Sequence, residues 1–200
     1  MKVLVGCEFS GIVRDAFLRI GHDAWSCDLL PCERGGPHIQ CDVRDILSDN
    51  WQLAIFHPPC THLAVSGARW FGNKIREQAE ALDFVRALLA APIPQIALEN
   101  PVSIISTAIR KPDQIIQPFE YGEPFQKTTC LWLKCLTKLI PTCIMQERKQ
   151  KCWLESPGPD RWKRRSKTYQ GIANAMADQW GGWSVEDAIS KPSHARVMLL

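Results

Sequence analysis

A cysteine and a glutamate occupy equivalent places in two separate parts of this sequence. Cys60 closes the tripeptide Pro58-Pro59-Cys60 soon after the apolar run 53–56, and Glu99 directly follows the apolar run 96–98. Each run reads as a buried strand, and α/β sheets bind ligands at the carboxyl ends of their strands. We therefore expect both side chains to face one pocket, where a thiol can act as a nucleophile and a carboxyl group can exchange protons.

The pair also has a plain structural reading, in which Cys60 is a buried core thiol and Glu99 a surface carboxylate. A Pro-Pro-Cys loop after a buried strand is an unusual place for core packing, which favours the chemical reading. His57 stands close to the thiol in sequence. A protonated imidazole there would lower the pKa of Cys60, whereas a lone histidine is more often a hydrogen-bonded structural residue.

The elements around these residues follow the pattern of an α/β domain. Short apolar runs bounded by Gly and Pro alternate with helical periodicity, which predicts a Rossmann-like, doubly wound and mostly parallel sheet with a closing antiparallel hairpin. Strands are expected at 2–6, 23–27, 37–41, 53–56 and from 96, helices at 10–20 and 74–89, the hairpin at 115–121 and 128–133, and a last helix at 171–180.

Length and composition favour a single domain spanning 1–200. Of the 200 residues, 46% are hydrophobic and 22% are charged, which is enough for one sizeable core. The longest apolar stretch, 87–91, is followed by a proline and is far too short to cross a membrane, and the N-terminal residues do not read as a signal peptide. We therefore expect a cytoplasmic protein that has no membrane partner.

Nine cysteines are a high and odd number for a chain of this length. Without a secretory signal, they are expected to be reduced thiols rather than a disulfide framework. Their spacing includes no Cys-x-x-Cys pair of the kind that structural zinc sites use. We expect no metal and interpret most of these cysteines as small buried apolar residues.

Positive charge is concentrated in one segment of the chain. Residues 134–167 hold ten Lys or Arg against three Asp or Glu, a net charge of +7, whereas the remainder holds fourteen against eighteen, a net charge of −4. Trp153 and Trp162 interleave with these basic residues, a mixture suited to phosphate contact and base stacking. The alternative is a solvated basic loop with two packed tryptophans. We favour contact with nucleic acid and assign it to Arg161, Lys163, Arg164 and Arg165.

Short motifs follow one another along most of the chain. They are Glu8-Phe9-Ser10-Gly11, Asp28, Cys41-Asp42-Val43, Pro58-Pro59-Cys60, Leu98-Glu99-Asn100-Pro101, Tyr121-Gly122 with Gln126-Lys127, and Ala173-Asn174-Ala175. This ordered series resembles the motifs of DNA cytosine-5 methyltransferases, and more narrowly the short members carried by bacteriophages and prophages. The resemblance runs from residue 3 to about residue 180. It implies the S-adenosylmethionine-dependent methyltransferase fold and, in a phage, evasion of host restriction.

The resemblance gives the pair of reactive residues specific roles. Cys60 would supply the thiolate that adds to C6 of cytosine and so makes C5 able to accept a methyl group. Glu99 would hold N3 and the exocyclic amine of the same base. Because C5 is out of reach in a stacked duplex, the target base would have to be flipped out.

The cofactor implied by the resemblance is S-adenosylmethionine. Phe9 would pack against the adenine, whose amino group Asp42 would meet, and Asp28 would bind the ribose hydroxyls. The full set of residues assigned to this cofactor is Phe9, Ser10, Gly11, Asp28, Asp42, Val43 and Asn174. Read structurally, the same residues are a core phenylalanine, a helix cap and loop acids.

The partner implied by the resemblance is DNA, double- or single-stranded. The segment 61–73 corresponds to the mobile loop that closes on a flipped base, where Arg69 or Trp70 would fill the vacated stack. Lys127, at the end of the Gln126-Lys127 motif, would add a further contact to nucleic acid.

The sequence departs from the family pattern at three places. Ile12 and Val13 stand where glycines are usual, and Thr128 and Cys130 stand where two arginines are expected. Residues 134–167 form a short basic insertion in place of a full target-recognition domain. Two alternatives therefore stay open: the same fold acting on RNA, single-stranded DNA or a nucleotide, and a catalytically inactive relative that binds nucleic acid.

Overall fold

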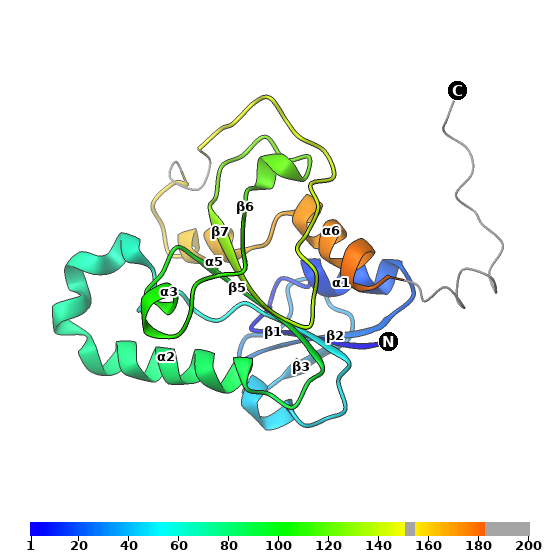
Figure 1. The fold of residues 1–200 in the computed structure, drawn as a ribbon, viewed down its shortest axis with the longest axis horizontal. Coiled ribbons are helices and arrows are strands. Elements are labelled where there is room, and N and C mark those ends of the chain that lie inside the picture. Colours follow the sequence, from blue (N-terminus) through cyan, green and yellow to red (C-terminus); the bar gives the residue numbers. More distant parts are fainter. Residues whose placement is uncertain (151–154, 183–200) are drawn as a thin grey trace.

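A seven-stranded mixed sheet forms the centre of the molecule, as the computed structural model shows (Figure 1). The structure describes residues 1–150 and 155–182, except the side chains of residues 69–71. The strand order is β3-β2-β1-β4-β5-β7-β6. The strands are β1 (Lys2–Gly6), β2 (Asp23–Asp28), β3 (His38–Gln40), β4 (Leu53–Phe56), β5 (Gln95–Pro101), β6 (Gln114–Ile116) and β7 (Thr129–Lys134).

The direction of the strands confirms the predicted Rossmann-like fold. Strands β3, β2, β1, β4 and β5 are parallel, whereas β7 runs antiparallel to β5 and to β6. The expected closing hairpin is therefore present, with β7 inserted between β5 and β6. The order reverses beside β1, so the carboxyl ends of β1 and β4 flank the switch point where such sheets bind ligands.

Helices cover both faces of the sheet (Figure 1). They are α1 (Ile12–Arg19), α2 (Ile75–Leu89), α3 (Ile105–Ala108), α5 (Arg161–Ser166) and α6 (Gln170–Trp180), with 3-10 turns at Val43–Ile46, Val65–Asn73 and Pro118–Glu120. Apolar residues of α1 and α6 share one buried cluster with β1 and β4, while α2 and α3 contribute to the cluster on the opposite face. This two-sided burial explains why every residue of β4 is apolar and buried.

Strand β5 extends further than its apolar residues indicate. The sequence predicts a strand that ends near Leu98, but β5 continues to Pro101 because Glu99, Asn100 and Pro101 pair with Leu131, Cys130 and Thr129 of β7. Glu99 therefore lies within a strand rather than on a loop. The backbone before and after Glu99 is paired with β7, and this pairing gives the Glu99 carboxylate a fixed place.

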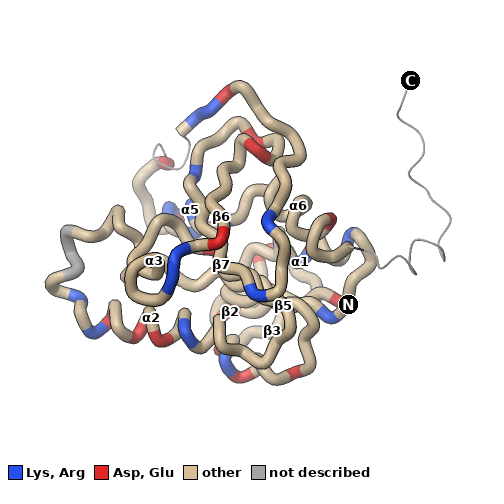
Figure 2. Tube along the Cα trace, in the orientation of Figure 1, with Lys and Arg blue, Asp and Glu red and all other residues tan. Residues whose placement is uncertain are grey.

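The first half of the basic segment 134–167 packs against the rest of the domain. Residues 139–149 run alongside 117–126, with backbone hydrogen bonds from Gly122 to Cys143 (2.7 Å) and from Gln126 to Lys149 (2.9 Å). Basic residues recur along this segment and on α5 (Figure 2). The segment is thus fastened to the loop between β6 and β7, at the end of the sheet where β4 and β5 finish.

Among the helices in the described part of the chain, none has the length and apolarity that crossing a lipid bilayer demands.

Candidate active site

Cys60 lies on an exposed loop at the carboxyl end of β4. Three hydrogen bonds fix the loop. The Asn100 side-chain amide donates to the carbonyl of Pro58 (2.9 Å), and the amides of Leu63 and Ala64 donate to the carbonyl of Cys60 (3.0 and 2.9 Å). The first contact ties the loop to β5, the strand that carries Glu99. The structure therefore holds the ends of β4 and β5 together, while a pocket shared by Cys60 and Glu99 stays a prediction.

Both acidic and basic side chains act on the pKa of the Cys60 thiol. The protein atoms around the sulfur desolvate it, although the residue as a whole is exposed, and this raises the pKa of Cys60. The carboxylate of Glu99 raises the pKa further, while Lys127 and Arg165 lower it. Cys60, Glu99, Lys127 and Arg165 thus share one electrostatic environment, although the last two come from distant parts of the sequence.

Glu99 is held by a histidine. Its Oε2 lies 3.1 Å from Nδ1 of His57, and the two side chains are 11% and 9% exposed. Burial by itself raises the pKa of Glu99, but the hydrogen bond from His57 and the charge of Lys127 outweigh it, so the pKa lies below its ordinary value. Glu99 is therefore an ionised acceptor at neutral pH.

The other ring nitrogen of His57, Nε2, is buried and makes no hydrogen bond to any described residue. The ring lines a small cavity with Cys7, Glu8, Phe9 and Ser10 at the end of β1. His57 therefore lies between this cavity and the acid at the end of β5. Of the two readings that the sequence left open for His57, the structure shows a hydrogen-bonded residue, whose partner is Glu99.

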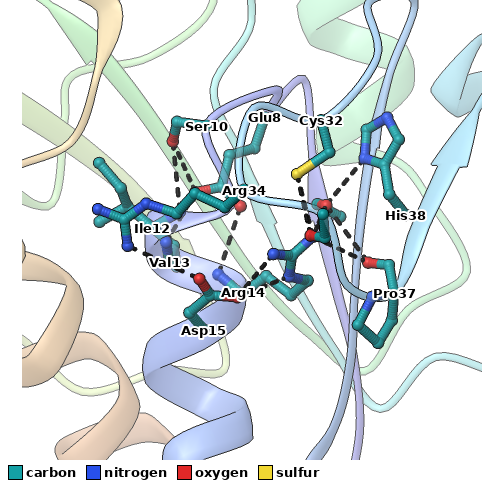
Figure 3. Close-up of polar contacts among 12 residues, drawn as sticks. Glu8, Ser10, Ile12, Val13, Arg14, Asp15, Cys32, Arg34, Pro37 and His38 are labelled. Atoms are coloured by element: carbon teal, nitrogen blue, oxygen red, sulfur yellow. Dashed lines mark hydrogen bonds and ion pairs between the residues drawn. The ribbon is translucent and has the colours of Figure 1, made fainter.

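Glu8 caps helix α1 from the loop after β1 (Figure 3). Its carboxylate accepts hydrogen bonds from the amides of Val13 (2.7 Å) and Arg14 (3.3 Å) and from the Ser10 hydroxyl (3.2 Å). Ser10 in turn accepts from the amide of Ile12 (3.3 Å). Gly11 precedes the helix at φ 71°, a left-handed conformation that glycine adopts without strain. Ser10 is thus one of two capping side chains, while Gly11 is the N-cap residue itself.

The Arg14 side chain holds the loop between β2 and β3 in place through hydrogen bonds (Figure 3). Its side chain is 1% exposed, and its Nη1 donates to Ser26 Oγ (3.0 Å), to Cys32 Sγ (3.2 Å) and to the carbonyl of Pro37 (3.2 Å). Asp15 balances the buried charge, since its Oδ1 accepts from Nη2 at 2.6 Å. A buried guanidinium needs such partners, and here they fix the loop that follows Asp28.

The residues predicted to bind a cofactor lie along this end of the sheet, and they differ in burial and in hydrogen-bond partners. Phe9 is buried and its ring centroid lies 5.8 Å from that of Trp162. Asp28 ends β2 and accepts from the amide of Leu30 (2.9 Å), and burial raises its pKa. The carboxylate of Asp42 is engaged by the guanidinium of Arg44, whose hydrogen bonds lower the pKa of Asp42.

Two further predicted cofactor residues differ in exposure. Val43 is a core residue, and it packs so close to the end of β1 that a Cβ on Gly6 would lie 2.8 Å from it. Asn174 is half-buried on α6, where its side-chain oxygen accepts from Gln170 (3.1 Å).

The cavity at the end of β1 is too small for S-adenosylmethionine as the structure stands. Its volume is about 40 Å³, whereas small-molecule pockets have roughly 300–1,000 Å³. Residues 166–168, between α5 and α6, form its outer wall. An ion pair of 2.5 Å between Lys167 and Glu33 anchors this wall to the loop after β2. The polar lining residues Glu8, Ser10 and His57 suit a nucleoside ligand. The cavity is too small to admit one unless residues 166–168 move.

The predicted nucleic-acid contacts fall into two groups. Lys127 lies beside the site, with its Nζ 3.4 Å from the carbonyl of Lys167, and α5 carries Arg161, Lys163, Arg164 and Arg165. Arg164 is paired with Glu155 (2.8 Å). Arg69 and Trp70 belong to the 3-10 segment Val65–Asn73, but their side chains lie outside what the structure describes. Trp153 lies outside the described residues altogether.

Eight of the nine cysteines are described, and all eight are free thiols. Three of them, Cys7, Cys27 and Cys41, lie at the ends of β1, β2 and β3, with 3.8 Å between the sulfurs of Cys27 and Cys41. Burial raises the pKa of Cys27 to about 12, so this thiol stays protonated. Across residues 1–150 and 155–182, no cluster of His, Cys, Asp and Glu is arranged to hold a metal ion.

Sequence reasoning missed the roles of three residues of the site, two of which, His57 and Asn100, it had named. The bond between His57 and Glu99 joins positions 42 apart, so local sequence gives no sign of it. Asn100 could have been found, since it stands beside Glu99 in the quoted motif. Lys167 lines the cavity at the end of β1 and is paired with Glu33, and its charge alone gave no sign of that partner.

Comparisons with known proteins give little additional information. No protein-family profile matches the chain, and no curated protein matches it. Among solved structures, the chain is similar to a prophage-encoded protein of E. coli that is assigned to the DNA modification methyltransferases, at 16% identity and a TM-score of 0.48. The match covers 78% of this chain and 55% of that one, so the chain spans little more than half its length. At this level of similarity, the activity has to be inferred from the residues of this chain.

Proposed function

We propose that this protein transfers a methyl group to C5 of cytosine in DNA through a covalent adduct between Cys60 and C6 of the base. One observation carries the proposal: an exposed thiol and a half-buried, ionised carboxylate lie at the ends of neighbouring strands and within electrostatic reach of the same lysine. The quoted motifs supply the reaction class. The Rossmann-like sheet supplies the usual place for such a site.

Cys60 is the nucleophile in this proposal. Because the surrounding protein and Glu99 raise the pKa of its thiol, only a small fraction is thiolate in the free protein at neutral pH. Lys127 and Arg165 act in the opposite direction and stabilise the thiolate. A substrate that binds to Glu99 would shield its negative charge from the sulfur, so binding of the base favours the reactive form.

Glu99 is the group that recognises cytosine. His57 occupies Oε2, and we assign Oε1 to the exocyclic amine of the base. N3 of the base would bind with a proton taken from solvent and shared with the Glu99 carboxylate, so the thiolate would add to C6 of a protonated ring and no negative charge would build up on it. His57 does not touch the base in this arrangement and is a positioning residue for Glu99.

S-adenosylmethionine is the methyl donor that we propose, and it would supply the methyl group that C5 accepts. We assign its adenosine part to Phe9, which lines the small cavity at the end of β1, and to Asp28, which ends β2. Residues 166–168 must move for it to enter. The basic segment 134–167 would contact DNA in place of a target-recognition domain, and in a phage this modification would mask restriction sites.

The decisive test is covalent trapping. An oligonucleotide with 5-fluorocytosine at the target position blocks release of the enzyme, so the wild-type protein incubated with S-adenosylmethionine should form an adduct that survives denaturation. Cys60→Ser should form none, whereas Cys135→Ser, which changes another exposed cysteine, should trap like the wild type. An adduct of equal yield with Cys60→Ser would refute the proposed nucleophile.

A second candidate keeps the same chemistry but acts on a single-stranded or mononucleotide substrate. The observation that favours it is the attachment of residues 139–149 to the loop between β6 and β7, which leaves little of the basic segment to read a duplex. Trapping with single-stranded and duplex oligonucleotides of one sequence distinguishes the two. Preference for the duplex by more than tenfold would argue against this candidate.

A further inference from the structure

Two thiols that the proposed reaction does not use lie close together at the carboxyl end of the sheet. Their sulfurs, on Cys27 and Cys41, are 3.8 Å apart, although 14 positions separate the two residues in the chain. Cys27 lies in β2, opposite Ile39 of the parallel strand β3, and Cys41 directly follows β3. The sheet therefore brings the two cysteines together from neighbouring strands, at the edge where such sheets bind ligands.

The two thiols differ in their access to solvent. Cys27 is fully buried, and burial raises its pKa to about 12. Cys41 is half-buried, so it is the member of the pair that a small molecule can reach from outside. Apart from each other, the sulfurs contact backbone carbonyl oxygens, at 3.5 Å for Cys27 and 3.3 Å for Cys41. A thiol is a weak donor, so these contacts do not prevent a bond between the sulfurs.

Each cysteine directly precedes an acid that the resemblance assigns to the cofactor. Asp28 follows Cys27, and Asp42 follows Cys41. In a disulfide the sulfurs would have to approach from 3.8 Å to about 2.0 Å, which draws the ends of the two strands together. Val43 is buried against the end of β1 and cannot follow this movement. The shift therefore falls on the residues beside the sulfurs, the two acids included.

We propose that Cys27 and Cys41 form a reversible disulfide when the protein meets a peroxide, and that this bond weakens the binding of the methyl donor. The bond itself is independent of the function proposed above. Its effect on the donor rests on that function, because it acts through Asp28 and Asp42. Disulfides inside cells are usually transient and redox-sensing, so a bond that a thiol reductant reopens agrees with a chain whose cysteines are expected to be reduced.

The chemistry consumes one peroxide molecule for each bond. The thiolate of Cys41 attacks a peroxide oxygen, the O–O bond breaks, and a sulfenic acid forms while the hydroxide that leaves takes up the proton lost by Cys41. The Cys27 sulfur then attacks the sulfenic sulfur. The S–O bond breaks, and the oxygen leaves as water with the proton of Cys27. Both sulfurs are thereby oxidised, and the peroxide is reduced to two molecules of water.

Peptide mapping tests where the bond forms. The reduced protein is treated with a small excess of hydrogen peroxide, its remaining thiols are blocked, and a tryptic digest is analysed by mass spectrometry without reductant. Cleavage after Arg19, Arg34 and Arg44 places the two cysteines on separate peptides, 20–34 and 35–44. These peptides should be joined with the loss of two hydrogen atoms, and dithiothreitol should separate them.

Three variants identify the sulfurs. Cys41→Ser should give no joined peptides. Cys32→Ser, which removes the other cysteine of peptide 20–34, and Cys135→Ser, which changes an exposed cysteine elsewhere, should both be joined like the wild type. In urea the link should lose its preference, because the folded sheet brings the sulfurs together. Loss of the link in Cys32→Ser, or a link from Cys7 in its place, overturns the assignment.

Titration calorimetry tests the effect on the donor. After peroxide treatment, the wild type should bind S-adenosylmethionine roughly tenfold more weakly, the loss expected when a hydrogen bond to a charged group is displaced, and dithiothreitol should restore the affinity. The same treatment should leave the affinity of Cys41→Ser unchanged, which excludes oxidation at Cys60 as the cause. Equal affinity of the reduced and the bridged wild type overturns the effect.

The two proposals fail separately. If the reduced protein does not bind S-adenosylmethionine, the proposed cofactor is refuted and the effect on it falls as well, whereas the peptide map still decides the bond. Failure of trapping at Cys60 refutes the proposed nucleophile and changes neither the map nor the calorimetry.

Discussion

Replacement of His57 tests how the acid is held in place. His57→Phe removes the 3.1 Å bond to Glu99 and leaves a carboxylate that is 11% exposed without its closest partner. Hydrogen bonds to charged groups contribute about 1.5–3 kcal/mol. We therefore expect the variant to be less stable by about that amount at pH 7, and turnover to fall roughly 10- to 100-fold if the same contact is kept in the transition state.

The pH dependence gives this prediction its sign. The pKa of Glu99 is lowered in the folded protein, so its contribution to stability is present above the unfolded pKa, near 4.5, and is lost as the pH falls through the folded value. The stability difference between the wild type and His57→Phe should therefore be full at pH 7 and should shrink below about pH 4.5. Urea unfolding at pH 7 and pH 3 measures it.

A conservative variant separates positioning from packing. His57→Gln can donate an amide hydrogen to Glu99, so it should recover part of the stability and turnover, and the acid limb of its pH–rate profile should lie between those of the wild type and His57→Phe. If Phe and Gln lose equal activity, and the stability loss is the same at both pH values, the bond between His57 and Glu99 has no part in the site.

Two shorter predictions concern the loops around the site. Glu33→Gln breaks a half-exposed ion pair with Lys167 that is worth about 0.2–1 kcal/mol, so the affinity for S-adenosylmethionine should rise by up to about fivefold in titration calorimetry; a lower affinity would show that the pair does not close the cavity. Asn100→Ala leaves the buried carbonyl of Pro58 unsatisfied and should cost about 1–3 kcal/mol in urea unfolding, with slower trapping at Cys60; unchanged stability would contradict the role of this bond.

The sequence predicted the architecture because its signals are local. Apolar runs such as 53–56 mark strands that are buried on both faces, and the periodicity over 74–89 marks α2 within one residue at its start. Strand β5 was predicted too short, since the partner that prolongs it, β7, lies more than 25 residues further along the chain. Helix α5 was not expected at all because its six residues include four basic side chains and no apolar face.

The prediction of the site rests on motifs that coincide with strand ends. Cys60 and Glu99 could be paired from sequence because both follow apolar runs of a parallel sheet, and the structure places them in one electrostatic environment. The contacts that shift the pKa values of Cys60 and Glu99 could not be predicted from the sequence. The contacts of His57, Lys127 and Arg165 join side chains from positions far apart in the chain, and residue type alone does not identify such partners.

The size of the cavity at the end of β1 follows from a chain of contacts that begins at a buried arginine. Arg14 binds Cys32 and the carbonyl of Pro37, which fixes both ends of the loop that carries Glu33 (Figure 3). The amide of Glu33 donates to the carbonyl of Phe9 (2.9 Å), and its carboxylate then holds Lys167 over the end of β1. The inner contacts of Arg14 are part-buried, whereas the ion pair of Glu33 with Lys167 is half-exposed and contributes least to stability. If the wall opens, it should therefore open at Lys167, while the loop beneath it stays in place to meet the ligand.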